Sequence, residues 1–172
     1  MTIRETKKSD LDDILDIHER AFGQKDEAEL VANLLKDETA QPVLSLMAFQ
    51  DDEPVGHILF TKAIVDGASA YLLAPLAVVP ELHFKGTGQR LMKEGIKRLR
   101  AQGVDLVFVL GHIDYYPRAG FKNDAGAMGY PAPHPIPHEH RDAWMVMNLS
   151  GTQKKGTVKV ADAISALEYW SD

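Results

Sequence analysis

Apolar residues recur at helical spacing in two stretches near the start of the chain. A short strand is predicted before them at residues 2–5, and Ser9 is a suitable N-cap for a first helix that Gly23 ends. One face of that helix collects five residues: Leu11, Ile14, Leu15, His18 and Phe22. The second stretch has its own apolar stripe: Leu30, Val31, Leu34 and Leu35. The pattern therefore predicts a strand followed by two amphipathic helices.

In the middle of the chain the spacing changes to that of strands. Residues 43–49 and 55–65 flank the polar turn QDDEP and predict a hairpin. The next run, YLLAPLAVVP, is apolar throughout, which is typical of a strand covered on both faces. Pro75 lies in its middle and has no N–H to donate to a neighbouring strand, so we expect a bulge or a sheet edge there.

Residues 88–102 return to helical spacing, and Gly103 ends this helix. The apolar run VDLVFVLG follows, so the pattern predicts a strand–helix–strand unit with parallel strands and a right-handed crossover. DAWMVMNL predicts a later core strand, and we expect a further strand at residues 157–160 and a short helix near Ile164. Together these elements indicate a mixed α/β sheet flanked by helices.

Composition narrows the class of protein. The chain has 172 residues, 45% of them hydrophobic, which suits one core, and we expect a single domain over residues 1–172. The net charge of −6, without a block of like charges, argues against a nucleic-acid partner and slightly favours a cationic small molecule. There is no cysteine, no apolar leader and no run long enough to span a membrane. We expect a cytoplasmic protein without a membrane partner.

The stretch HFKGTGQRLM places two glycines at the start of a predicted helix. The first amides of a helix have no internal partner, so this bare backbone indicates an anion site. A dinucleotide fingerprint would need a glycine at Leu91, and a P-loop would need Gly-Lys-Ser/Thr, so both templates fail. Two alternatives remain open. Gly86 and Gly88 could simply form a tight turn that binds no anion. The nearby cations Lys85, Arg90 and Lys93 could contact phosphates or could form a solvated face.

The longer segment LAVVPELHFKGTGQRLM resembles the acyl-CoA loop of the GNAT superfamily of N-acetyltransferases. That pattern is a strand ending in Leu-x-Val-x-Pro, then Gln/Arg-x-x-Gly-x-Gly/Ala opening a helix. The matching positions here are Leu76, Val78, Pro80, Gly86 and Gly88. His83 stands where the family has Gln or Arg, so the side-chain contribution at that place differs.

The resemblance implies a GNAT-like acyl-CoA N-acyltransferase fold, with a mixed, mostly antiparallel sheet and helices on both faces. It also implies acetyl-CoA as co-substrate, without a metal. The backbone of Leu76, Ala77 and Val78 would bind the pantetheine arm. The pyrophosphate would be wrapped by the loop residues His83, Phe84, Lys85, Gly86, Thr87 and Gly88.

A second segment, GHIDYYPRAGF, resembles the part of the same superfamily that follows the next strand. There a tyrosine stands four residues before Gly-Phe, which here is Tyr116, and the resemblance implies that it protonates the departing CoA thiolate. The family's frequent Asn-x-x-Ala pattern is missing, so we expect a short helix. The alternative for Tyr116 is a structural tyrosine packed beside Tyr115.

The acceptor amine must lose a proton, and the sequence leaves the base open. Glu27 and Glu29 could face the acceptor. Alternatively, they have no catalytic role and complement the helix dipole in the first turn. His112 follows a buried strand, where active sites of open α/β sheets gather, or it is a structural histidine. An amide beside the expected bulge, such as that of Leu76, would be the natural oxyanion donor.

The resemblance therefore implies transfer of an acetyl group to a primary amine by direct attack, because no cysteine could carry the acyl group. The spacing of His134, His138 and His140 does not fit zinc. The acceptor is not identified; the variable loops at residues 23–29 and 122–142 would select it. Two other functions stay open, a catalytically silent CoA sensor and a nucleotide-binding domain, and the oligomeric state is equally open, a homodimer being one alternative.

Overall fold

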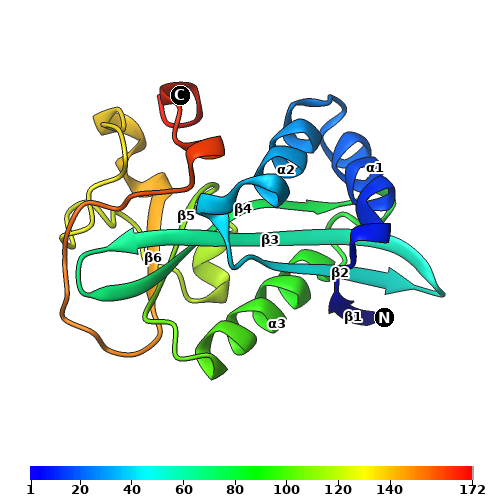
Figure 1. Cartoon of the computed structure of the whole chain (residues 1–172), viewed down its shortest axis with the longest axis horizontal. Helices are drawn as coiled ribbons and strands as arrows, with labels where there is room; N and C mark the ends of the chain where they lie inside the picture. The colour runs from blue at the N-terminus through cyan, green and yellow to red at the C-terminus, as the bar shows by residue number, and fades with distance from the viewer. Residues whose placement is uncertain (172) are drawn as a thin grey trace.

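The computed structural model describes residues 1–171 and shows a six-stranded sheet with helices on both faces (Figure 1). The strands follow one another across the sheet in chain order: β1 (Thr2–Glu5), β2 (Leu44–Gln50), β3 (Glu53–Val65), β4 (Ala68–Val78), β5 (Leu106–Leu110) and β6 (Trp144–Asn148). Neighbouring strands are antiparallel except β4 and β5, which are parallel. The predicted mixed, mostly antiparallel sheet is confirmed.

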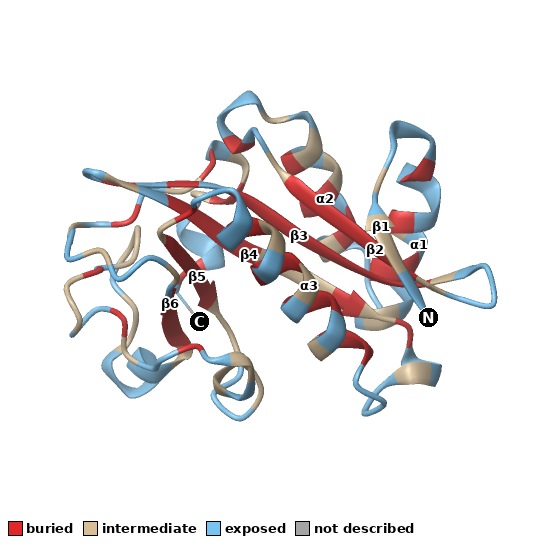
Figure 2. Cartoon of the chain, turned by 90° about the horizontal axis from the view of Figure 1, so that it is seen from below, coloured by how far each residue is buried: buried red, intermediate tan, exposed pale blue. Residues whose placement is uncertain are grey.

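The three α-helices of the described residues divide between the two faces of the sheet. Helices α1 (Leu11–Phe22) and α2 (Asp26–Lys36) cover one face, and α3 (Thr87–Ala101) covers the other (Figure 1). Helix α3 connects β4 to β5, so the predicted strand–helix–strand unit is confirmed. Figure 2 shows that the strands are mostly buried and that exposed residues lie on the outer helix surfaces and in the loops.

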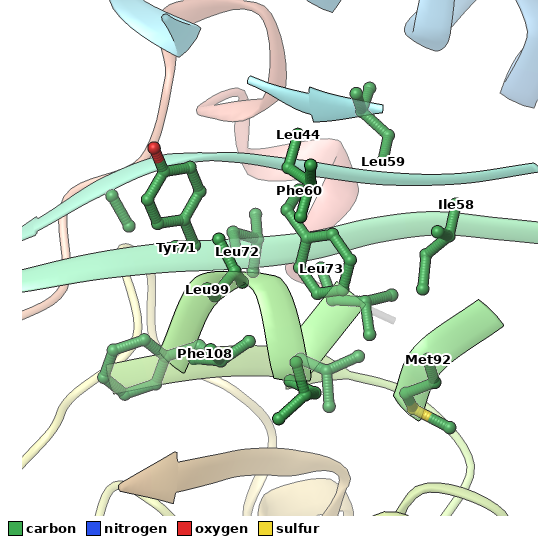
Figure 3. Close-up of a cluster of buried hydrophobic side chains, with 14 of the residues drawn as sticks. Leu44, Ile58, Leu59, Phe60, Tyr71, Leu72, Leu73, Met92, Leu99 and Phe108 are labelled. Atoms are coloured by element: carbon green, nitrogen blue, oxygen red, sulfur yellow. The ribbon is translucent and has the colours of Figure 1, made fainter. Parts of the chain in front are cut away.

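Helix α3 lies close to β3 because Gly95 has no side chain. A Cβ atom at Gly95 would lie 2.6 Å from Cζ of Phe60, whose side chain is fully buried. Figure 3 shows Phe60 within a cluster of buried side chains from β3, β4, α3 and β5. The Phe60 ring cannot move without disturbing this cluster, so the contact sets the distance between α3 and the sheet.

The predicted cap of the first helix is wrong. Ser9 lies inside a 3-10 turn, Lys8–Asp10, and α1 begins only at Leu11. The Asp10 carboxylate accepts hydrogen bonds from the Arg4 guanidinium, 2.8 Å to the nearer oxygen, and this partner holds the pKa of Asp10 at about 2. Because Arg4 comes from β1, this ion pair joins the start of α1 to the edge of the sheet.

The predicted C-terminal elements are reduced to turns. Of the strand expected at residues 157–160, only one bridge forms, between Lys159 and Ile64 on β3. The short helix expected near Ile164 is a 3-10 turn, Asp162–Ile164. This segment runs back along the sheet without extending it.

A chain of buried polar side chains joins α1 to the sheet. His18 Nε2 on α1 lies 2.8 Å from His57 Nδ1 on β3, and His57 Nε2 lies 2.8 Å from the Ser45 hydroxyl on β2. The Thr6 hydroxyl donates to Ser45 at 2.7 Å. Within residues 1–171, His18 Nδ1 has no hydrogen-bond partner. Burial lowers the pKa of His18 to about 4 and that of His57 well below its usual range, so both are neutral at pH 7.

These histidines should make stability depend on pH. The unfolded chain takes up protons near pH 6.5, whereas folded His18 does so only near pH 4. The free energy of unfolding should therefore fall as pH drops through that window, by about 1.4 kcal/mol per pH unit for each histidine. Urea unfolding at several pH values measures the slope. In His18→Gln, the number of protons taken up on unfolding, which sets this slope, should be smaller by about one. Ser45→Ala keeps both histidines and should lower stability by about 1 kcal/mol with the slope retained. A His18→Gln slope equal to that of the wild type would contradict this expectation.

Candidate functional site

Strands β4 and β5 diverge soon after they pair. Their ladder joins only Ala70–Leu72 to Leu106–Phe108. On its other side, β4 shifts register against β3, where Ala74 and Pro75 both stand against Leu59; of the two alternatives predicted there, a bulge or an edge, the structure has the bulge. A bulge bends the strand that contains it, so the second half of β4 turns away from β5 and a gap opens between them.

The gap exposes backbone groups of β4. Val79 N–H donates to Val55 O on β3 at 2.9 Å. The backbone N–H and C=O groups of successive residues point to opposite sides of a strand. Those of Ala77 therefore also point toward β3, and those of Leu76 and Val78 point into the gap. His83 bonds there already, since its Nε2 donates to Val78 O at 2.7 Å. The Leu76 amide is therefore directed into the gap, as an oxyanion donor would need to be.

The start of α3 presents a row of free amides. Its first helical hydrogen bond runs from Arg90 N–H to Gly86 O at 3.0 Å. Within residues 1–171, the amides before it donate to no acceptor: Gly86, Thr87, Gly88 and Gln89. Unpaired amides and the positive end of the helix dipole together form a site for an anion such as a phosphate.

The two glycines of this loop are needed for different reasons. Gly86 has φ +84°, in the left-handed region, and a Cβ atom there would meet open space. Gly88 has an ordinary φ, but a Cβ atom there would collide with the Tyr115 hydroxyl oxygen and lie 3.4 Å from Tyr115 Cζ. Gly86 is therefore needed because the backbone there has a positive φ, whereas Gly88 is needed because it makes room for a side chain from another segment.

A cavity of about 860 Å³ occupies the gap and the space before α3. It is lined by Phe22, Leu76, Val78, Leu82, His83, Phe84, Gly86, Thr87, Gly88, Gln89, His112, Asp114, Tyr115, Tyr116 and Arg118. Phe22 comes from α1 and Gly88 from α3, on opposite faces of the sheet. The cavity therefore reaches both faces, and two substrates could meet inside it from opposite sides.

Most of the residues predicted to bind the cofactor line this cavity. They are Leu76, Val78, His83, Phe84, Gly86, Thr87 and Gly88. In the described structure, Ala77 and Lys85 lie outside the lining; Ala77 is buried, with its backbone toward β3. Of the predicted cations, Lys85, Arg90 and Lys93 are all exposed.

The predicted catalytic residues separate into two groups. Tyr116 and His112 line the cavity. Within the described residues, Glu27 and Glu29 lie outside it, in the first turn of α2. Glu27 accepts a hydrogen bond from Gln24 at 3.2 Å, and Glu29 is exposed. The geometry brings the tyrosine and the histidine together and leaves the two glutamates aside.

Tyr116 is held by close packing. Its ring lies against Gly111, where a Cβ atom would be 2.9 Å from Cδ2, and it meets the Phe121 and Tyr115 rings edge-on. Burial raises the pKa of Tyr116 well above its usual range, and the neighbouring Tyr115 phenol adds to this. The phenol is therefore protonated at neutral pH and is able to donate a proton. The segment after β5 forms only a 3-10 turn, Tyr116–Ala119, as the missing Asn-x-x-Ala pattern predicted.

Sequence reasoning missed part of the lining. Asp114, Tyr115 and Arg118 lie within the segment already singled out around Tyr116, but nothing in their spacing showed that they face the same cavity. Phe22 was assigned to an apolar helix face, yet 42% of its surface is exposed. An exposed aromatic residue at the end of an amphipathic helix was the available signal.

The histidine-rich loop contributes no metal site. His134 Nε2 donates to Ser165 O at 2.6 Å. Within residues 1–171, no group of three His, Asp or Glu side chains is placed to hold a metal ion. None of the helices in that range has the length and apolar character that crossing a bilayer requires.

Comparison with known proteins gives a consistent result. A family model described as an acetyltransferase (GNAT) domain matches residues 2–123. An uncharacterized N-acetyltransferase of Escherichia coli K12, YjhQ, is 49% identical over 167 residues, covering 94% of this chain and 92% of the relative.

Two solved structures are similar over nearly the whole chain. The GNAT family N-acetyltransferase YhbS of Escherichia coli, in complex with CoA, has a TM-score of 0.85 and 26% identity, covering 96% of this chain and 92% of that one. A GNAT family acetyltransferase of Brucella melitensis, in complex with acetyl-CoA, has a TM-score of 0.76 and 28% identity, covering 95% and 97%.

The contact between Gly88 and Tyr115 can be tested by stability measurements. Alanine favours helix over glycine by about 1 kcal/mol. Gly88→Ala should nevertheless destabilise the wild type, because the new methyl group meets the Tyr115 hydroxyl. In a Tyr115→Phe background, where that oxygen is absent, the same change should be neutral or stabilising. Gly86→Ala should destabilise both backgrounds, since its strain is in the backbone. Urea unfolding of the six proteins decides this, and an equal cost of Gly88→Ala in both backgrounds would rule the contact out.

Proposed function

Since this chain belongs to the GNAT family of acetyltransferases, we propose that it moves an acetyl group from acetyl-CoA to a primary amine of a small molecule or peptide. The amine attacks the thioester directly, and Tyr116 is the general acid. The chain carries no cysteine that could hold the acyl group between the two substrates. We expect the reaction to take place in the cytoplasm.

One observation carries this proposal: a single cavity joins the free amides of α3 to the gap between β4 and β5. The amides of Gly86 to Gln89 fit the diphosphate of acetyl-CoA, and the gap-facing backbone of Leu76 and Val78 fits the amide groups of its pantetheine arm. In this arrangement the thioester lies near Leu76, and Tyr116 lines the same cavity.

The amine has to arrive neutral, although an alkylamine near pH 7 is mostly protonated. His112 and Asp114 both line the cavity, and His112 follows β5 directly. The Asp114 carboxylate attracts the ammonium form, and His112 accepts its proton, directly or through one water. Their place in the lining favours them over Glu27 and Glu29.

Attack on the thioester places negative charge on the carbonyl oxygen. The Leu76 amide stabilises that oxyanion because it is directed into the gap and already fixed by the strand. The nitrogen of the tetrahedral intermediate then loses its second proton to solvent, the C–S bond breaks as the intermediate collapses, and the thiolate takes a proton from Tyr116. The tyrosinate regains its proton from solvent before the next turnover. The net reaction releases the amide, free CoA thiol and the proton that the ammonium brought.

Removing the Tyr116 hydroxyl should separate chemistry from binding. Tyr116→Phe should lower kcat about 10²-fold or more while the Kd for CoA stays within about threefold of the wild type. The released CoA thiol is read with a thiol reagent, without background because the chain has no cysteine. A full kcat in Tyr116→Phe, with an amine that the wild type acetylates, would exclude this tyrosine as the acid.

The choice of base can be tested with matched amide variants. His112→Gln should lower kcat/KM about 10²-fold, whereas Glu27→Gln and Glu29→Gln should each change it less than about threefold. All three are assayed with the same amine across pH. A large loss confined to Glu27→Gln or Glu29→Gln would move the base to α2.

The two other functions predict different results. Stabilisation of the fold by CoA but not by ATP or NAD, in a thermal-shift comparison, is expected here and would exclude a nucleotide-binding domain. Binding of acetyl-CoA without thiol release across a broad amine panel would instead indicate a catalytically silent sensor.

A further inference from the structure

The loop before α3 offers an anion its backbone but little from its side chains. The His83 imidazole is held by Val78 O at 2.7 Å, so it is directed back toward the strand. Lys85 lies outside the cavity lining of the described structure. The diphosphate of CoA is negatively charged at neutral pH, and four amides alone leave that charge without a cationic partner. A second wall of the cavity has to be considered.

The Tyr115 hydroxyl lies beside the free amides. In a helix the Cα–Cβ bond tilts toward the N-terminus. The hydroxyl occupies the position that a Cβ atom of Gly88 would take, so it lies at the side of the first turn, toward the open end of α3. Within residues 1–171, this hydroxyl has no hydrogen-bond partner. A phenol O–H here can donate to the same anion that the amides bind.

Arg118 adds positive charge at the same place. Its side chain is exposed and lines the cavity, and no ion pair engages it within the described residues. Burial raises the pKa of the Tyr115 phenol, and the Arg118 charge opposes that rise. Tyr115 and Arg118 line the same cavity as the start of α3, and Arg118 brings a positive charge to it.

The Tyr115 side chain is held in position before any ligand arrives. The Gln89 side-chain amide on α3 donates to the backbone carbonyl oxygen of Tyr115 at 3.2 Å. The ring meets that of Tyr116 edge-on, with 5.1 Å between centroids and an angle of 87°. Groups fixed in advance lose little entropy on binding, so a hydrogen bond from this hydroxyl would contribute most of its strength to affinity.

We propose that the Tyr115 hydroxyl and the Arg118 guanidinium bind the diphosphate of CoA together with the α3 amides. This inference rests on the proposed function, because it assigns two further residues to the same co-substrate. It explains why Gly88 lacks a side chain: the helix start makes room for a donor from the loop after β5. It also places a cofactor ligand directly beside Tyr116 in the chain.

Calorimetric titration of the full chain with CoA and with dephospho-CoA, which lacks the 3′-phosphate, tests the assignment. Tyr115→Phe and Arg118→Gln should each weaken binding of both ligands about five- to tenfold, since each removes one donor to a charged group. Two matched controls carry the same changes away from the cavity. Tyr169→Phe alters a partly exposed tyrosine near the C-terminus, and Arg100→Gln lies at the far end of α3; both should leave Kd within twofold.

The outcomes separate the two proposals. A wild type that binds neither ligand would overturn the proposed function and this inference with it. A wild type that binds CoA, with Tyr115→Phe and Arg118→Gln within twofold of it, would overturn the inference alone. If the loss in Arg118→Gln appears with CoA but vanishes with dephospho-CoA, Arg118 binds the 3′-phosphate and the diphosphate assignment is wrong. Unfolding temperatures of all variants show whether a weakened Kd reflects a damaged fold.

Discussion

The site depends on the early divergence of β4 and β5. The two strands pair over three residues each and then separate, because the bulge at Pro75 turns β4 away from its parallel neighbour. In a continuous sheet the backbone of Leu76 and Val78 would be consumed by ladder hydrogen bonds. The divergence removes those ladder bonds, leaving Val78 O to the His83 imidazole, and opens a passage through the sheet. The cavity that reaches both faces, and hence a meeting place for two substrates, follows from it.

The second determinant is the way in which α3 meets the loop after β5. Within residues 1–171 the first amides of the helix have no carbonyl acceptor, and Gly88 leaves room for Tyr115 to approach them. Two segments separated by more than twenty residues in the chain therefore share one binding surface. Because Tyr115 and Tyr116 are adjacent, the residue proposed to contact the diphosphate and the residue proposed to protonate the sulfur belong to one short segment.

The chain of polar side chains through His57 positions α1 at a cost in free energy. Burying two imidazoles and a serine costs free energy unless their hydrogen bonds are made, and one nitrogen of His18 stays unpaired within residues 1–171. The chain holds α1 to β2 and β3 in a specific register. Phe22 at the end of that helix stacks on His18 and lines the cavity. Core polarity and site geometry are therefore linked through one helix.

Sequence patterns by themselves determined the order and kind of the elements up to β6, and they predicted a bulge or an edge at Pro75 and the glycine-rich start of α3. These features are local: a residue without an N–H, a glycine and an apolar period act in the same way wherever the chain goes. The N-cap of the first helix and the C-terminal segment were predicted less well, since Asp10 takes its partner from β1 and residues 157–160 meet only one strand. Only the tertiary structure decided that Gly88 makes room for Tyr115 and that the two glutamates of α2 lie outside the cavity. Both facts depend on how segments far apart in the sequence lie in space, which no local pattern encodes.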